Sequence, residues 1–420
     1  MSRRRDAGAR IAAAVVGVVV GVGLIFVLGA VGGTTESGTR PTSSPPTSRV
    51  TASPESDPSP SPTRHQGDPD HPGSGPRDAF LAWAPGSLPA HTEREIDVLR
   101  VVRTATTVYA GLDWIKSWTL PGARSPERPP PGYAIPFEIA SVQPNEYARF
   151  ALPDDRRPIR GLDAGEALLA ETSRKLRSGG RGLRIDLGER RVRVVGTVDD
   201  RSTNGYEALI AGPPPPEWAR ADRFVLARLK EPGRRRTVER KIESLLPPGQ
   251  PLQTRIAGEN PFLRYGDAVL PQLIIKDTFG EFAARPLEDG RVEIEPHWVR
   301  RNITTARVPI LGEVTCHRLL FPQLRAALRD IQRQGLAHAI HPEQFAGCYS
   351  PRFISSNPDG RLSHHSWGVA IDINAWENGF GTKADLDMRI VEIFEDRWGF
   401  TWGGRWIVPD GMHFEWVKFP

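Results

Sequence analysis

The sequence predicts an α+β fold that ends in a small antiparallel sheet with packed helices. A separate α+β domain precedes this sheet, and a transmembrane helix precedes both. Three observations lead to this prediction. Residues 11–31 form one uncharged apolar stretch. Residues 80–282 mix short strand-like and helical patterns. Residues 292–420 combine two amphipathic helical segments with short apolar runs that are typical of strands.

The length and composition fit a globular protein of more than one folded unit. The chain has 420 residues, which exceeds what a single domain usually requires. A hydrophobic content of 39% and a charged content of 25% argue against wholesale disorder. The net charge is only +5, and no basic run is interleaved with aromatic residues. A nucleic-acid partner is therefore not expected.

The N-terminus has the pattern of a membrane anchor. Arginines at positions 3–5 precede residues 11–31, whose length suffices for a helix to cross about 30 Å of hydrocarbon. Basic residues before the span predict that residues 1–10 form a cytoplasmic tail and that the remainder is exported. The expected location is therefore the cell membrane, with a single pass. A cleaved signal peptide is the alternative, because Ala30 and Gly32 are small residues at cleavage spacing.

Residues 34–76 are dominated by Pro, Ser, Thr and Gly, and they predict a disordered spacer. Ordinary globular sequence resumes near Phe80 and defines an α+β domain at residues 80–282. No catalytic constellation stands out in this domain. A spacer or a module that binds a protein partner is the expected role.

Four patterns define the elements of residues 80–282. Residues 163–176 have helical spacing, with Asp163 as a possible N-cap. Residues 183–198 alternate around a Gly-Glu turn and predict a hairpin. Residues 223–229 predict a strand and residues 237–246 a helix. The order of these elements, and the strand "VRVVGTV", resemble the extracytoplasmic core domain of MacB-type transporter subunits.

The C-terminal domain is expected at residues 292–420. A helix is predicted at 321–335, where Pro322 stands near the start and Gly335 at the end. A second helix is predicted at 386–399, and strand-like runs occur at 368–374 and 412–419. The residues of the first helix that should face the core are Leu324, Leu328 and Ile331.

The only two cysteines, Cys316 and Cys348, both lie in this domain. If the domain is exported, they are expected to pair in an oxidising compartment. The disulfide would close a loop of about thirty residues. The alternative is a zinc–thiolate site, which needs more ligands than two distant cysteines offer.

His365 and Asp372 are the first candidate functional residues. They are seven positions apart, so they share a face only if the chain turns or bulges between them. Gly368 is where this bend is expected, because glycine tolerates it best. Asp372 stands between Ile371 and Ile373 and therefore points away from them. A buried carboxylate of this kind needs a partner or a metal ion.

The partner candidate is His413, which shares a strand face with Glu415. Two imidazoles and one carboxylate form a ligand set that suits Zn²⁺. Three protein ligands leave a position open for water, which distinguishes a catalytic zinc from a structural one. Asp410 could reach that water as general base. Glu415 is better placed to orient a ligand histidine.

Both segments carry family motifs. "SHHSWGVAID" matches the pattern S-x-H-x-x-G-x-A-x-D, and "DGMHFEW" matches D-x-x-H-x-E. These patterns resemble those of the VanY-type zinc peptidases, and the resemblance covers about residues 298–420. It implies a VanY/Hedgehog-like zinc peptidase fold. That family comprises D-alanyl-D-alanine carboxypeptidases and L-alanyl-D-glutamate endopeptidases, which cleave peptidoglycan stem peptides.

The resemblance also implies a role for individual residues. The zinc ligands of the family fall on His365, Asp372 and His413, and its catalytic acidic residue falls on Asp410. Arg352, in "GCYSPRFIS", matches the arginine that these enzymes place before the first ligand. A guanidinium at that point would stabilise the negative charge that develops on the carbonyl oxygen.

Other polar and aromatic residues of this domain have simpler interpretations. His364 is one residue out of register for a ligand, and Ser363 is interpreted as a hydrogen-bonding support. His338 and His341 lie between Gly and Pro in a loop and are expected on the surface. The aromatic segment 398–406 could line a substrate cleft or pack in the core.

The expected function is that of a membrane-anchored, extracytoplasmic zinc metallopeptidase that hydrolyses peptidoglycan stem peptides. Two alternatives remain open at this stage. The C-terminal domain could bind peptidoglycan without cutting it. Alternatively, residues 80–282 could be the main functional part, as an adaptor in a membrane complex.

Overall fold

The computed structural model describes residues 76–214, 222–258, 262–267, 270–358 and 360–419. Within these ranges, no helix combines the length and the apolar character needed to cross a membrane. The predicted tail and anchor at residues 1–31 lie outside the described residues, as does nearly all of the predicted spacer. The described residues form a mixed α+β structure, which confirms the predicted class.

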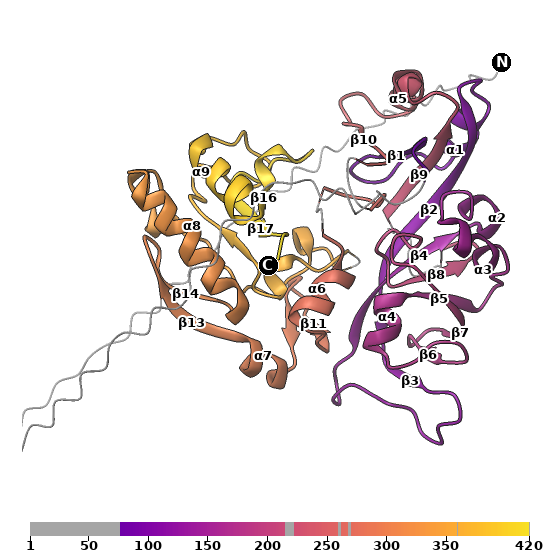
Figure 1. Cartoon of the computed structure of the whole chain (residues 1–420), viewed down its shortest axis with the longest axis horizontal. Helices are drawn as coiled ribbons and strands as arrows, with labels where there is room; N and C mark the ends of the chain where they lie inside the picture. Colours follow the sequence, from indigo (N-terminus) through magenta and orange to yellow (C-terminus); the bar gives the residue numbers. More distant parts are fainter. Residues whose placement is uncertain (1–75, 215–221, 259–261, 268–269, 359, 420) are drawn as a thin grey trace, which may run out of the picture. The chain divides into compact units, whose positions relative to one another are not determined.

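The largest sheet takes its ten strands from residues 79–256 (Figure 1). Their order is β10-β1-β9-β2-β4-β8-β5-β7-β6-β3. Neighbours are antiparallel except in the pairs β4–β8 and β5–β7. The strands are β1 (Ala79–Trp83), β2 (Val102–Ile115), β3 (Ser117–Thr119), β4 (Ile135–Val142), β5 (Glu166–Ala170), β6 (Arg184–Asp186), β7 (Arg191–Val198), β8 (Ala208–Ala211), β9 (Asp222–Leu229) and β10 (Gln253–Ile256).

Apolar side chains cover both faces of the central strands of this sheet. Every residue of β4 is buried, because alternate side chains enter two different hydrophobic clusters. Short helices connect or flank the strands. They are α1 (Thr92–Asp97), α2 (Pro144–Tyr147), α3 (Arg156–Arg160), α4 (Glu171–Leu176), α5 (Arg235–Glu243) and α6 (Gln272–Phe279).

One predicted element of this region is wrong. The expected helix at 163–176 is instead the strand β5 followed by the helix α4. Leu168 and Leu169 occupy a strand because β5 pairs with both β7 and β8, so both of their side chains find apolar neighbours. Asp163 consequently caps no helix over these residues. The predicted hairpin at 183–198, the strand at 223–229 and the helix near 237–246 are confirmed as β6–β7, β9 and α5.

The remaining elements form smaller sheets and their covering helices (Figure 1). The three-stranded antiparallel sheet β15-β17-β16 is the predicted sheet of the C-terminal region. Two further two-stranded sheets are β11–β12 and β13–β14. The elements are β11 (Ala284–Pro286), β12 (Val292–Ile294), α7 (Pro296–Asn302), β13 (Ile303–Val308), β14 (Gly312–His317), α8 (Phe321–Arg333), β15 (Ala370–Asp372), α9 (Met388–Glu392), β16 (Phe400–Trp402) and β17 (His413–Trp416).

Both predicted helices of this region are present with shorter bounds, since α8 ends at Arg333 and α9 spans Met388–Glu392. The helix α8 buries the three side chains that the sequence assigns to the core. The second helix begins at Met388 because the Asp387 side chain caps it by accepting a hydrogen bond from the Arg389 amide. It ends in a π-helical turn over Ile393–Arg397. The domain boundaries at 80–282 and 292–420 stay predictions.

The predicted disulfide between Cys316 and Cys348 is present. It joins the end of β14 to the loop that leads toward β15. We expect the double replacement Cys316→Ser and Cys348→Ser to lower the free energy of unfolding by about 2–4 kcal/mol, because the unfolded chain loses a constraint. Guanidinium denaturation with and without a reductant measures this. A reductant should shift the midpoint of the unaltered chain and leave that of the variant unchanged; equal midpoints throughout would contradict the expectation.

Candidate metal centre

Two antiparallel strands bring a carboxylate and an imidazole together in the C-terminal sheet. In the pairing of β15 with β17, Asp372 lies opposite His413, and Ala370 lies opposite Glu415. Residues opposite each other in such a pair have side chains on the same face of the sheet. The register therefore places Asp372 and His413 side by side, although they are 41 residues apart in the sequence.

His365 reaches the same point from a short turn before β15. A 3-10 helix spans His364–Ser366, and the Ser363 hydroxyl caps it by accepting a hydrogen bond from the His365 amide at 3.4 Å. Gly368 then turns the chain with a φ of +67°. A Cβ at Gly368 would lie 2.7 Å from the backbone nitrogen of His317. The bend predicted at Gly368 is thus confirmed, and its conformation and close packing both favour glycine.

The three side chains form a compact triangle of possible ligand atoms. Asp372 Oδ1 lies 3.1 Å from His365 Nε2 and 2.8 Å from His413 Nδ1, and the two nitrogens are 3.1 Å apart. All three residues are buried. The ligand atoms of a tetrahedral zinc ion, bound at about 2.0–2.1 Å, lie ~3.3 Å from one another. The spacing and the chemistry of these donors therefore suit Zn²⁺.

The backbone carbonyl of Cys348 sets the orientation of His365. It lies 2.8 Å from His365 Nδ1. A carbonyl oxygen can only accept, so His365 Nδ1 carries the proton and donates it in this contact. The lone pair of Nε2 is then free on the side of Asp372 and His413. Because Cys348 belongs to the disulfide, the crosslink holds the group that orients this histidine.

The carboxylates Asp372 and Glu415 favour a positive charge in the cluster. Burial opposes the ionisation of Asp372, but His365 and His413 outweigh it and hold the pKa of Asp372 below its ordinary value. Burial also disfavours a charged His413, yet hydrogen bonds to Asp372 and Glu415 raise the pKa of His413 to about 10. Asp372 and Glu415 therefore favour a positive charge at His413, which lies between them. A metal ion bound at Nδ1 would supply that positive charge in place of a proton.

Asp410 has a carboxylate oxygen that no hydrogen-bond donor satisfies. Its Oδ1 is buried and has no partner among the described residues. The backbone places it next to the cluster, because the Asp410 carbonyl accepts a hydrogen bond from the His413 amide at 3.1 Å. Burial raises the pKa of Asp410 to about 6. A carboxylate with this pKa can take up and release a proton near neutral pH, as a general base must.

Arg352 also reaches the cluster. Its guanidinium Nη2 lies 3.4 Å from Asp372 Oδ2, and 32% of its side chain remains exposed. The backbone of Arg352 is fixed by Ser366, whose hydroxyl lies 3.2 Å from both the amide and the carbonyl of Arg352. The arginine that the family resemblance assigns to the site therefore contacts the cluster, and its side chain is partly exposed to solvent.

Glu415 and His364 form a chain of contacts behind His413. Glu415 Oε1 lies 3.2 Å from His413 Nε2 and 3.0 Å from His364 Nδ1. Burial opposes the ionisation of Glu415, but the neighbouring His364 and His413 lower the pKa of Glu415. The orienting position predicted for Glu415 therefore matches its contacts. The contact of His364 with Glu415 was not predicted, because it depends on the 3-10 turn rather than on strand alternation.

Replacing Glu415 with glutamine is expected to weaken zinc binding about 10–100-fold, because the His413 ring loses the charged group that orients it. Competition with a chelator of known affinity measures the change. Glu313→Gln, at an exposed carboxylate of β14, is the matched control and should bind zinc as the unaltered chain does. An unchanged zinc affinity in Glu415→Gln would contradict this role.

The tryptophans of the aromatic segment 398–406 have two different surroundings. Trp398 and Trp402 are buried, and their indole nitrogens donate to Asp330 and to the Gly411 carbonyl. Trp406 is half-buried, and its ring centroid lies 5.2 Å from that of His413. The sequence left open whether this segment packs in the core or lines a cleft. Trp398 and Trp402 pack in the core, whereas Trp406 lies beside the ligand residue His413. His338 is exposed and His341 half-buried, and neither joins the cluster.

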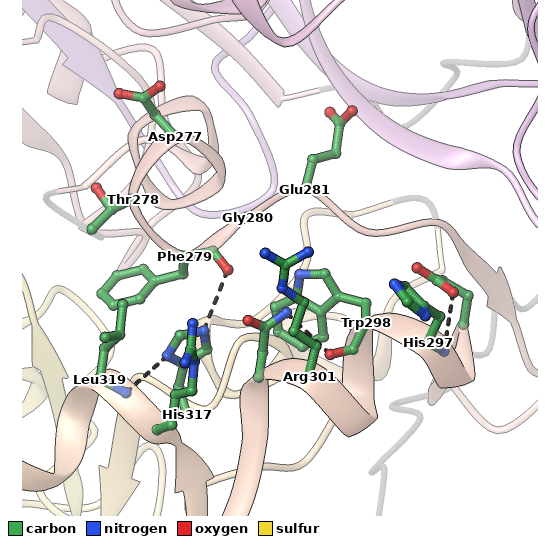
Figure 2. A pocket seen from close by; sticks show the side chains of 13 residues that line it. Asp277, Thr278, Phe279, Gly280, Glu281, His297, Trp298, Arg301, His317 and Leu319 are labelled. Carbon is green, nitrogen blue, oxygen red and sulfur yellow. Dashed lines mark hydrogen bonds between the residues drawn. The ribbon is translucent and has the colours of Figure 1, made fainter.

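A separate cavity of about 450 Å³ lies between α7, the segment 277–281 and the residues after β14 (Figure 2). Figure 2 shows Trp298, Arg301 and His317 among the side chains that line this cavity. The His317 ring is held by the Phe279 carbonyl at 3.3 Å and the Leu319 amide at 3.2 Å. Burial lowers the pKa of His317 to about 4, so this imidazole is neutral. None of the His–Asp–His residues lines this cavity.

Two similarities to known proteins concern separate parts of the chain. None of the curated proteins compared with the chain matches it. The periplasmic region of MacB from Actinobacillus actinomycetemcomitans is similar to the middle region, with 9% identity over 44% of this chain and 90% of that chain. The TM-score is 0.30, so this similarity carries no functional argument.

The second similarity concerns the metal centre itself. Residues 356–416 match the family model described as D-alanyl-D-alanine carboxypeptidase. This segment contains His365, Asp372 and His413, together with Asp410 and Glu415. Arg352 and both cysteines lie before it. The resemblance that the two motifs indicate is therefore confirmed for residues 356–416: the segment that carries the His–Asp–His cluster is similar to the D-alanyl-D-alanine carboxypeptidase family.

Proposed function

We propose that this protein is a zinc metallopeptidase that hydrolyses peptide bonds in peptidoglycan stem peptides outside the cytoplasmic membrane. Residues 11–31 would anchor it as a single transmembrane helix. The family match over residues 356–416 supports a peptidase related to peptidoglycan. The observation that carries the proposal is the buried Oδ1 of Asp410, which has no partner among the described residues, close in the fold to three converging ligand atoms.

In this proposal, the ligand residues, Asp410 and Arg352 have separate roles. His365, Asp372 and His413 would hold Zn²⁺, which when bound polarises a carbonyl group and lowers the pKa of water. Asp410 accepts the proton of the attacking water, since its raised pKa suits proton uptake near neutral pH. It then delivers that proton to the departing amine. Arg352 offers a fixed guanidinium to the oxygen on which negative charge develops.

Hydrolysis accounts for Asp410 better than binding alone does. A buried carboxylate oxygen without a hydrogen-bond donor costs free energy. A protein that only holds a peptide has no use for such a group next to a metal ion. A hydrolase needs it, because the proton of the attacking water must go to a base within hydrogen-bond reach.

The proposal is tested by mass spectrometry of digested peptidoglycan. The zinc-loaded full chain in detergent should release fragments from purified peptidoglycan, and removal of zinc with a chelator should stop the release. Loss of a terminal D-alanine identifies a carboxypeptidase, and cleavage between L-alanine and D-glutamate identifies an endopeptidase. Intact stem peptides after prolonged incubation with the zinc-loaded chain would contradict the proposal.

A further inference from the structure

The loop at residues 374–387, which follows the strand of Asp372, exposes two aromatic side chains. This loop connects β15, which carries Asp372, to α9. Trp376 is 75% exposed and Phe380 is 54% exposed. Four other tryptophans of the C-terminal region, Trp367, Trp398, Trp402 and Trp416, are buried. An indole left in water forgoes the stabilisation that its burial would bring, so its exposure points to a ligand.

The loop is held rigidly by two buried asparagines. The Asn374 side chain accepts a hydrogen bond from the His341 amide at 3.0 Å and donates to the Ala339 carbonyl at 2.8 Å. The Asn378 side chain is fully buried, donates to the Asn374 carbonyl at 3.1 Å and accepts from the Asp385 amide at 2.7 Å. The aromatic side chains are therefore displayed by a preorganised backbone, which lowers the entropy cost of binding.

The same loop is bonded to the segment that carries the proposed base. The Met412 amide donates to the Asn378 carbonyl at 3.0 Å, and the Gly381 amide donates to the Pro409 carbonyl at 2.7 Å. These bonds lie on either side of Asp410. Trp376 is only four residues from Asp372 along the chain. The exposed aromatics thus belong to a loop that follows one ligand residue and is bonded to the segment of the proposed base.

The net charge of the loop indicates which class of ligand the exposed indole of Trp376 could bind. Residues 374–387 contain one lysine and three acidic residues, so their net charge is −2. Loops that insert into membranes combine aromatic residues with Lys and Arg, because bilayer surfaces are anionic. An acidic loop is repelled by such a surface and by free carboxylates. A flat apolar ring in acidic surroundings instead fits an uncharged ligand with an apolar face, such as a sugar ring.

We propose that the loop at 374–387 binds the uncharged N-acetylated sugar rings of the glycan strand, with Trp376 as the residue on which a ring stacks. This inference rests on the proposed function, because it extends the substrate from the stem peptide to the glycan that bears it. Trp376 determines specificity in this account: it favours stem peptides that are still attached to glycan over free peptides. It takes no part in the proton transfer of Asp410.

The first test measures sugar binding directly. Isothermal titration of the full chain in detergent with an N-acetylglucosamine tetramer should give a binding signal. Trp376→Ala should lower the affinity at least tenfold, and Trp376→Phe should retain part of it, because a smaller ring stacks less well. Leu319→Ala, at a 45% exposed leucine on the rim of the separate cavity, is the matched control and should bind as the unaltered chain does. Equal affinities in all four chains would overturn the inference.

The second test measures selectivity. In Trp376→Ala, the ratio of the hydrolysis rate on polymeric peptidoglycan to that on a free stem peptide should fall at least fivefold. An unchanged ratio would overturn the inference. So would a change of oligomeric state in Trp376→Ala, or loss of binding to vesicles with 30% phosphatidylglycerol, since these results assign Trp376 to a second copy or to a membrane.

The two proposals can fail separately. Sugar binding is also measured with His413→Ala, in which hydrolysis is expected to be lost. His413→Ala should keep its sugar binding. If the unaltered, zinc-loaded chain binds the sugar through Trp376 but cuts no stem peptide, the proposed function is contradicted and this inference stands. Hydrolysis without sugar binding would do the reverse.

Discussion

Replacing His413 with alanine is expected to abolish hydrolysis and to lower zinc affinity by more than about 100-fold. The imidazole supplies one of three ligand atoms, and even partners behind such ligands contribute about 10–100-fold to affinity. Its removal also leaves Asp372 and Glu415 without the group that lies between them. Zinc content per chain after gel filtration and fragment release from peptidoglycan measure the two effects.

A surface histidine provides the control for this replacement. His338 is exposed, and its Nδ1 lies 2.9 Å from the Gly335 carbonyl, outside the cluster. His338→Ala should keep full zinc content and activity. Circular dichroism of both variants separates loss of metal from loss of fold. Hydrolysis by a folded, zinc-free His413→Ala chain would contradict the assignment.

Replacing Asp410 with asparagine is expected to lower kcat by about 10²–10⁴-fold while zinc stays bound. Asparagine keeps the shape of the side chain but cannot accept a proton. The expected fall in kcat equals the rate contribution that is typical of a general base. Glu313→Gln, at an exposed carboxylate of β14, is the matched control. Equal kcat values in Asp410→Asn and the unaltered chain would show that another group accepts the proton.

The pH dependence of the rate follows from the same carboxylate. Burial raises the pKa of Asp410 to about 6, so the group is protonated below that pH and ionised above it. Only the ionised form accepts a proton. The rate of the unaltered chain should therefore fall as the pH drops below about 6. In Asp410→Asn, the residual rate should no longer show the fall that protonation of Asp410 causes.

The ligand residues could be predicted from the sequence because strand alternation and the two motifs constrain the same positions. Asp372 stands between two isoleucines, and a carboxylate in that setting needs a partner. The distance between Asp372 and His413 could not be predicted, since it depends on the register of β15 against β17. Long-range pairing of this kind is decided by packing across the whole sheet.

The errors and omissions have similar physical causes. Leu168 and Leu169 fit a helix as well as a buried strand, and only the neighbouring strands β7 and β8 decide between them. The contact of His364 with Glu415 depends on a single 3-10 turn. The loop that exposes Trp376 is held by hydrogen bonds of Asn374 with the backbone of His341 and Ala339, 33 and 35 residues away, which no local pattern reveals.

The most direct test of the account is a crystal structure of the zinc-loaded protein, with anomalous diffraction recorded on both sides of the zinc absorption edge. The account predicts one strong peak at about 2.0–2.2 Å from His365 Nε2, Asp372 Oδ1 and His413 Nδ1, with the carboxylate of Asp410 facing the open side. A peak elsewhere, or a fourth protein side chain closing the coordination sphere, would contradict it.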